Sequence, residues 1–167
     1  MEHILGLLRI NVRRGFNLAV RDVTSSDPYV VVRMGKQKLK TRVVKKNLNP
    51  EWNDHLTLSI VDAALPIHLM VYDKDVFSLD DKMGEADINI APYMEALRRD
   101  NLAGLPAGTI ITRVQPSREN CLAEESHIVR RDDGSVSQSM ILRLKNVERG
   151  EIELELEWID VPGSRGL

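Results

Sequence analysis

Stretches in which apolar and polar residues alternate recur along most of the chain and predict a protein built mainly of β-strands. The clearest is residues 151–159, where the glutamates would face solvent. Its alternate apolar residues would face the core: Ile152, Leu154, Leu156 and Trp158. Residues 4–13 show the same period, with Leu8, Ile10 and Val12 on the core side. Further strands are expected over residues 29–34, 36–44, 55–61, 68–72, 86–90, 109–114, 127–131 and 135–144.

The pattern changes after residue 90. Pro92 stands at a first helical position, and the residues that follow predict a helix of two or three turns that ends before Gly104. Further along, Asp133-Gly134 is a strong signal for a tight hairpin between two of the expected strands.

Together these elements predict an all-β fold, an eight-stranded antiparallel sandwich with an inserted short helix and extra strands. We assign the insertion to residues 91–139. The whole chain, residues 1–167, is long enough to bury one core and is expected to form a single domain. Residues 162–167 are expected to form a loose C-terminal tail.

Composition narrows the possible partners and compartments. The formal net charge of −2 argues against a nucleic-acid partner, so any basic surface must be local. No run of about 18 apolar residues is present, so no membrane-spanning segment is expected. Cys121 is the only cysteine, which excludes an intrachain disulfide and favours a reducing, cytoplasmic compartment.

The strand expected over residues 68–72 ends abruptly in a loop rich in carboxylates, namely Asp73, Asp75, Asp80 and Asp81. Carboxylates this close repel one another unless a cation lies among them. Calcium, which takes six to eight oxygen ligands from flexible loops, suits such a site. The alternative is a solvated acidic loop that binds nothing, because acidic loops are common.

A second acidic loop runs from Asp22 to Asp27, immediately before the strand that Pro28 introduces. If both loops lie at one end of the sandwich, five carboxylates converge: Asp22, Asp27, Asp73, Asp75 and Asp81. These are ligands enough for one calcium ion, and for two where carboxylates bridge neighbouring ions. We therefore expect a site for two calcium ions that is stabilised when metal binds.

Basic side chains form what we call the basic stripe: Lys36, Lys38, Lys40, Arg42, Lys45 and Lys46. The first four alternate at period two and so share one face of the expected strand. The stripe could be a solvated outer face, or could protect a sheet edge from aggregation. Because like charges on one face repel, a polyanionic partner such as an anionic phospholipid membrane is an equally good interpretation.

Three apolar residues, Val76, Phe77 and Leu79, lie among the acids of the loop that follows Asp73. Apolar side chains at the tip of a solvated loop suit insertion into a membrane interface. Val23, in the other acidic loop, would join them.

Three segments resemble the signature segments of C2 domains, the calcium-dependent phospholipid-binding sandwiches: RDVTSSDPYV at 21–30, NPEWN at 49–53 and VYDKDVFSLDDKMG at 71–84. The resemblance covers roughly residues 4–90 and 141–160. It implies calcium ligands at Asp22, Asp27, Asp73, Asp75 and Asp81, together with the backbone carbonyls of Arg21 and Lys74. In the same pattern Asp80 is not a ligand, Ser78 lies where some members add an oxygen, and the first loop is one residue shorter than in many members.

A closer resemblance spans nearly the whole chain, including GLPAGTI at 104–110, PSRENCLAEES at 116–126 and ELEWIDVPGSRG at 155–166. These segments are similar to the plant single-C2 proteins related to abscisic acid signalling, whose rice relatives are described as GTPase-activating proteins. The resemblance implies calcium-dependent binding to anionic membranes and recruitment of abscisic acid receptors to the plasma membrane, with positive regulation of the pathway. It implies the nucleus as a further location.

Intrinsic catalysis is not expected. The four histidines are scattered, none is placed near Cys121 or a serine as in a nucleophile arrangement, and there is no GxxxxGK[ST] phosphate loop. An activator of a partner GTPase or ATPase remains an alternative, because it needs only one arginine donated in trans. The insertion offers six candidates: Arg98, Arg99, Arg113, Arg118, Arg130 and Arg131. A third interpretation is a structural module whose acidic loops no longer bind metal.

Overall fold

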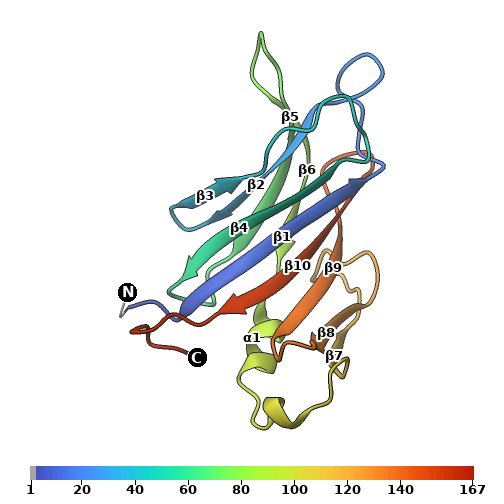
Figure 1. The fold of residues 1–167 in the computed structure, drawn as a ribbon. Coiled ribbons are helices and arrows are strands. Elements are labelled where there is room, and N and C mark those ends of the chain that lie inside the picture. Colours follow the sequence, from blue (N-terminus) through green and yellow to red (C-terminus); the bar gives the residue numbers. More distant parts are fainter. Residues whose placement is uncertain (1–2) are drawn as a thin grey trace.

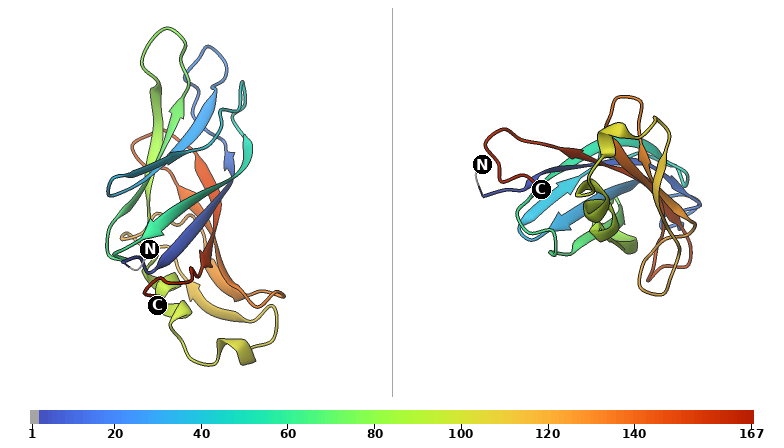
Figure 2. Two further views of the ribbon diagram at one scale, coloured as in Figure 1. Left: turned by 60° about the vertical axis from the view of Figure 1, so that its left-hand side comes forward. Right: turned by 90° about the horizontal axis from the view of Figure 1, so that it is seen from below.

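The computed structural model describes residues 3–167, which form two antiparallel β-sheets packed face to face with one short α-helix at one end (Figures 1 and 2). Six strands in the order β4-β1-β10-β9-β8-β7 form one sheet, and four in the order β3-β2-β5-β6 form the other. In chain order the strands are β1 (Gly6–Phe16), β2 (Pro28–Met34), β3 (Gln37–Lys40), β4 (Glu51–Ile60), β5 (Ile67–Asp73), β6 (Asp81–Ile88), β7 (Ile110–Val114), β8 (Ser126–Arg130), β9 (Val136–Arg143) and β10 (Glu151–Ile159). The predicted mostly-β sandwich is confirmed.

The core lies between the two sheets and uses the faces that the alternation predicts. Leu8, Ile10 and Val12 of β1 are fully buried. On β10, Ile152, Leu154 and Leu156 are buried, but Trp158 is only partly buried because its indole lies over Gly6 at the rim and its N–H donates to Asp160. The glutamates of β10 face outward as expected.

Glu155 differs from its neighbours because it is buried on that outer face. Two arginines cover its carboxylate, Arg13 at 3.1 Å and Arg131 at 2.9 Å. A carboxylate shielded from solvent needs such partners, since an unpaired buried charge is costly.

The segment expected to be an insertion, residues 91–139, extends the six-stranded sheet and places a helix at one end of the sandwich (Figure 1). Strands β7 and β8 add to the edge of β9, and Asp133-Gly134 lies in the turn between β8 and β9. Helix α1 (Ala91–Leu97) has Pro92 in its first turn and buries three side chains against the core, those of Tyr93, Met94 and Ala96. The short 3₁₀ helix η1 (Leu102–Gly104) follows it.

Several strands have different bounds from those expected. β1 continues to Phe16, three residues beyond the expected end, and β4 begins at Glu51 instead of residue 55. β6 begins at Asp81 instead of residue 86, so this carboxylate stands on a strand and not in a loop.

β3 ends at Lys40, because the Thr41 hydroxyl, in place of a main-chain carbonyl, accepts from the Val30 amide at 2.9 Å. The next residues still run beside β2, where the Thr41 amide donates to the Val30 carbonyl and the Val44 amide to the Pro28 carbonyl.

The loops that carry the acidic residues gather at one end of the sandwich, and α1 lies at the opposite end (Figure 1). The β9–β10 turn also reaches the loop end, where Glu85 of β6 and Lys145 exchange two main-chain hydrogen bonds that join the two sheets. At the other end, the amide of Arg165, in the segment expected to be a loose tail, donates to the carbonyl of Ile4 at 2.8 Å. No helix within residues 3–167 combines the length and apolar character needed to cross a bilayer.

Gly84 permits the close approach of the β9–β10 turn to β6. It has φ +106°, and a Cβ there would lie 2.6 Å from Val147 Cγ1 and 2.9 Å from Leu144 Cβ. We expect Gly84→Ala to lower the free energy of unfolding by about 3 kcal/mol or more, from backbone strain and overpacking together. Urea unfolding followed by circular dichroism measures this.

The matched control is Gly108→Ala, where φ is +85° and nothing lies within 4 Å of the added Cβ. Only the backbone strain remains there, about 1–2 kcal/mol. Equal losses in the two variants would contradict the packing argument.

Candidate calcium site

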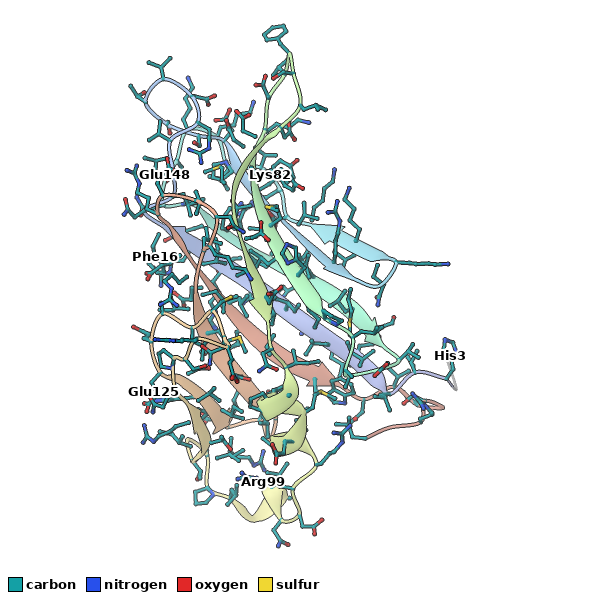
Figure 3. The ribbon with its side chains drawn as sticks, turned by 180° about the vertical axis from the view of Figure 1, so that it is seen from behind. His3, Phe16, Lys82, Arg99, Glu125 and Glu148 are labelled. Atoms are coloured by element: carbon teal, nitrogen blue, oxygen red, sulfur yellow. The ribbon has the colours of Figure 1, made fainter. Side chains whose placement is uncertain are left out.

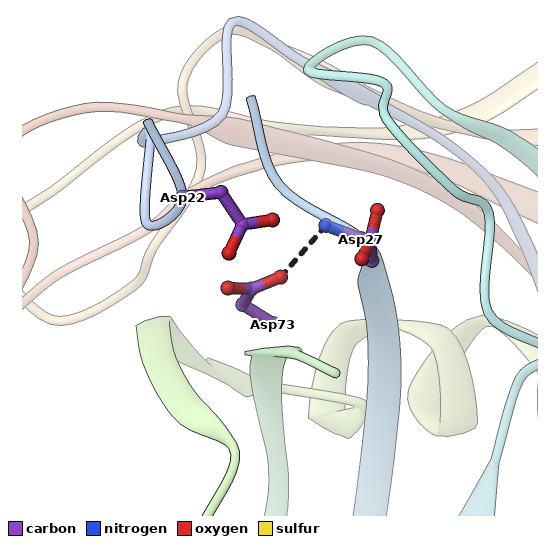
Figure 4. A group of neighbouring side chains, drawn as sticks. All are labelled: Asp22, Asp27 and Asp73. Carbon is purple, nitrogen blue, oxygen red and sulfur yellow. Dashed lines mark hydrogen bonds between the residues drawn. The ribbon is translucent and has the colours of Figure 1, made fainter. Parts of the chain in front are cut away.

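Three of the predicted carboxylates, those of Asp22, Asp27 and Asp73, converge at the loop end (Figure 4). One oxygen from each lies within 4.8 Å of the other two. Asp22 belongs to the β1–β2 loop, Asp27 directly precedes β2, and Asp73 is the last residue of β5. Segments far apart in the sequence therefore build one cluster.

The pairing of β2 with β5 places the cluster. Pro28 lies opposite Asp73 in the antiparallel register, so the end of β5 meets the start of β2. The Asp27 amide donates to Asp73 Oδ1 at 2.7 Å, and the Lys74 amide donates back to the Asp27 carbonyl at 3.0 Å. Trp52 is fully buried in the core, and its indole N–H donates to the Pro28 carbonyl at 3.1 Å.

The β1–β2 loop is folded around a buried hydroxyl. Ser26 Oγ donates to the Ala19 carbonyl at 2.8 Å and accepts from the Arg21 amide at 2.8 Å. The Asp22 amide donates to the Ser25 carbonyl at 2.9 Å. These bonds turn the short loop tightly enough to bring Asp22 over the end of β5.

Asp73 is the electrostatic centre of the cluster. Its side chain is only 1% exposed, and its Oδ2 has no hydrogen-bond partner within the described residues. The pKa of Asp73 is raised to about 6, chiefly by burial and also by the charges of Asp22, Asp27 and Asp81, against the opposing hydrogen bond from the Asp27 amide. A buried, unpartnered carboxylate oxygen among like charges is stabilised by a nearby cation, so the cluster fits a metal ion with oxygen ligands.

Asp75 and Asp81 are not part of this three-carboxylate cluster. The Asp75 carboxylate accepts from the Phe77 amide at 3.0 Å and from Ser78 Oγ at 2.8 Å, and these bonds lower its pKa. Asp81 is exposed at the start of β6, opposite Asp73 in the β5–β6 register. It is near enough to raise the pKa of Asp73.

The two backbone positions expected to supply ligands flank the cluster. Both Arg21 and Lys74 use their amides as donors within the loop end, as described above. Within residues 3–167, neither carbonyl oxygen accepts a hydrogen bond from the protein. Both oxygens therefore keep their lone pairs for another partner.

Sequence reasoning missed the role of Asp80, which organises the loop that carries Asp75. Its Oδ1 accepts from the Asp75 amide at 2.8 Å, and its Oδ2 accepts a short hydrogen bond from the Tyr29 hydroxyl. Tyr29 stacks on Tyr72 with ring centroids 5.6 Å apart. No local signal predicts this bond, because Tyr29 lies 51 residues away in the sequence.

The apolar residues at the loop tips are almost fully solvated: Val23 97%, Val76 83%, Phe77 97% and Leu79 92% exposed. These are the most exposed large apolar side chains among the described residues, and all four belong to the two acidic loops. Figure 3 shows side chains projecting from the loop ends beyond the body of the sandwich.

The basic stripe lies along β3, an edge strand of the four-stranded sheet, and continues into the β3–β4 loop. All six side chains are exposed. Arg42 also folds back, with Nη2 donating to the Trp52 carbonyl at 3.0 Å and its amide donating to Asp54 Oδ2 at 2.8 Å. The Lys46 amide donates to Asp27 Oδ1 at 2.7 Å, so the end of the stripe touches the acidic cluster.

Comparison with solved structures gives the fold. The structure is similar to a C2 domain of plant Extended Synaptotagmin 1, with a TM-score of 0.61 and 21% identity over 95% of this chain and 97% of that one. The calcium-bound pair of C2 domains of Extended-Synaptotagmin 2 gives a TM-score of 0.63 and 22% identity over 94% of this chain and 46% of that one.

Comparison of sequences is more specific. The C2 domain family model matches residues 6–103. The Arabidopsis thaliana protein C2-DOMAIN ABA-RELATED 1 is 62% identical over 169 residues, and the match covers 100% of both chains. GTPase activating protein 1 of Oryza sativa subsp. japonica is 57% identical, covering 100% of this chain and 99% of that one. The chain therefore belongs to the C2 domain family and, within it, to the C2-domain ABA-related proteins.

Proposed function

We propose that the protein is a calcium-dependent adaptor that binds anionic phospholipid membranes and recruits abscisic acid receptors to the plasma membrane, without catalytic activity of its own. The observation that carries this proposal is the buried Oδ2 of Asp73, which has no partner within the described residues and lies among three converging carboxylates. Such an oxygen calls for a compensating positive charge, and the all-oxygen donor set suits calcium.

Asp22, Asp27 and Asp73 would hold the first calcium ion, with the carbonyls of Arg21 and Lys74 close by. A second ion would need Asp75 and Asp81. Asp75 is held outside the three-carboxylate cluster by its bonds to the Phe77 amide and the Ser78 hydroxyl, so its carboxylate would have to move toward the cluster to share an ion with it. Bound calcium would reverse the sign of the loop end and leave coordination positions for lipid phosphates.

Two further features support membrane contact at the same end. Val76, Phe77 and Leu79, with Val23, would enter the interface once the acidic cluster is neutralised. The basic stripe would add attraction of roughly 1 kcal/mol for each residue close to an anionic surface, weakened by salt. The loop tips and the basic stripe together would bind the membrane reversibly but more strongly than either contact would alone.

The choice of protein partner rests on the relatives. The name of the Arabidopsis relative, 62% identical over the full chain, links it to abscisic acid. We assign receptor binding to the expected insertion, residues 91–139, because its strands β7 and β8 lie beyond residues 6–103, which the C2 family model matches, and extend the edge of the six-stranded sheet. The protein would then move between cytoplasm and plasma membrane as calcium changes, with the nucleus as a further location.

A second candidate function is activation of a partner GTPase or ATPase, which the name of the rice relative favours. An arginine donated in trans must be exposed and available. Four of the six candidates already have partners: Arg99 with the Ile111 carbonyl, Arg113 with Glu125, Arg130 with the Leu102 carbonyl and Arg131 with Glu155.

This leaves Arg98 and Arg118, which are exposed and make no side-chain hydrogen bond or ion pair within the described residues. If one of them acts in trans, the double variant Arg98→Ala, Arg118→Ala should stimulate a partner GTPase less than wild type does, with a turnover lower by about 10³-fold. The partner is a GTPase that the rice relative activates. Unchanged turnover would leave the adaptor function alone.

Asp73→Asn tests the calcium site. Wild-type protein should gain about 5–10 °C in melting temperature at a calcium concentration near one hundred times the dissociation constant. Asp73→Asn should lose most of this gain. In chelator the variant should melt at a higher temperature than wild type, because the raised pKa means that the ionised carboxylate destabilises the calcium-free fold at neutral pH.

Differential scanning calorimetry with calcium and with chelator measures both effects. Asp100→Asn removes the same charge from an exposed residue after α1 and is the matched control, with an unchanged calcium response expected. A full calcium response in Asp73→Asn would contradict the proposed site and favour acidic loops without metal.

Leu79→Ala tests insertion of the loop tip. Binding to phosphatidylcholine vesicles that contain phosphatidylserine should require calcium, and Leu79→Ala should weaken it roughly fivefold through the loss of about 1 kcal/mol of apolar burial. Leu65, exposed at the opposite end, provides the control Leu65→Ala, which should bind as wild type does. Cosedimentation measures this, and equal binding in calcium and in chelator would contradict calcium control.

A further inference from the structure

The side chain of Arg21 connects three segments at the loop end. Its Nη2 and Nη1 donate to the two carboxylate oxygens of Glu148 at 2.8 and 2.9 Å. Its Nε donates to the Lys82 carbonyl at 3.2 Å, and Nη1 also donates to the Val20 carbonyl at 3.1 Å. Lys82 and Glu148 both lie at the loop end of the sandwich (Figure 3). The guanidinium is therefore fixed in place by β6 and by the β9–β10 turn.

This fixed cation adjoins the acidic residues in the fold, because Arg21 directly precedes Asp22 and its Nε bonds to the carbonyl of Lys82, the residue after Asp81. Its pKa is raised chiefly by the hydrogen bond to Glu148, and the charges of Asp81 and Asp73 raise it further. Arg21 in turn lowers the pKa of Glu148 to about 2. The positive charge of Arg21 is therefore within electrostatic reach of two of the carboxylates proposed as calcium ligands.

We propose that Arg21, held by Glu148, is a positioning residue that sets the calcium affinity of the site. The guanidinium offsets part of the repulsion among the carboxylates when calcium is absent, and it opposes the incoming divalent cation. Glu148 keeps the guanidinium at the rim, because a forked arginine–carboxylate pair restrains both position and orientation. Without Glu148 the cation would be drawn toward Asp73 and Asp81 and would compete with calcium.

This role rests on the proposed calcium site and goes beyond it. The family pattern uses only the backbone carbonyl at position 21, whereas the role proposed here belongs to the charge of its side chain. Glu148 lies 127 residues away, on a turn that carries none of the expected ligands.

The test is a calcium titration of the full chain by isothermal calorimetry, without lipid and at low salt. Arg21→Gln should raise calcium affinity roughly three- to tenfold, because a repelling charge is removed. Arg21→Lys keeps the charge and should bind within about twofold of wild type. Glu148→Gln should lower the affinity, and should have no further effect in the Arg21→Gln background, where no cation is left to move.

The matched control is Arg113→Gln, which breaks an arginine–glutamate pair of 3.0 Å in the insertion and should leave calcium affinity unchanged. Melting temperatures in chelator identify any variant whose loop end has unfolded. Lower affinity in both Arg21→Gln and Arg21→Lys would overturn the proposal, since only loss of the forked geometry would explain it. An equal effect of Glu148→Gln in both backgrounds would overturn the link between the two residues.

Failure of the calcium site itself gives a different result. If wild-type protein shows no calcium binding, the proposed function and this inference both fall. If wild-type protein binds calcium and Arg21→Gln binds it equally well, only the inference falls.

Discussion

The loop end depends on how β2 and β5 pair, because that pairing puts a carboxylate where water cannot reach it. Asp73 ends β5 directly beside the start of β2, and the Asp27 amide satisfies only one of its two oxygens. The hydrogen bond fixes the carboxylate in place but does not compensate its charge. A precise main-chain register therefore produces a local shortage of positive charge, which is the property that a cation site requires.

The remaining acidic residues are held in two different ways. Asp22 and Asp27 are positioned by bonds that belong to the body of the sandwich, including those of the buried Ser26 hydroxyl. Asp75 instead bonds within its own loop, to the Phe77 amide and the Ser78 hydroxyl. One part of the site is thus pre-organised and the other must rearrange, so two ions would bind with different conformational costs.

Much of the fold could be predicted from the sequence, because burial in a sheet follows a period of two. The core faces of β1 and β10 follow that rule, and Asp133-Gly134 marks its turn. Where the prediction failed, the cause was a contact with a distant residue. β3 ends early because Thr41 bonds to Val30, and Glu155 is buried because arginines from β1 and from the β8–β9 turn cover it.

The same limit applies to the candidate site. The aspartates could be found from their spacing and from the family pattern, since both are local in the sequence. The bonds that position them could not be found in this way: Asp80 depends on Tyr29, and Arg21 depends on Glu148. These partners lie 51 and 127 residues apart, and only the folded chain brings them together.

The bridge between Glu85 and Lys145 has a mechanical consequence. Two main-chain hydrogen bonds and the close packing at Gly84 join β6, an edge strand of the four-stranded sheet, to the β9–β10 turn of the six-stranded sheet, and so resist separation of the sheets beside the loop end. Force applied to the loop tips by a membrane would therefore be transmitted to both sheets together. A pull at the loop tips would then load the whole sandwich as one unit.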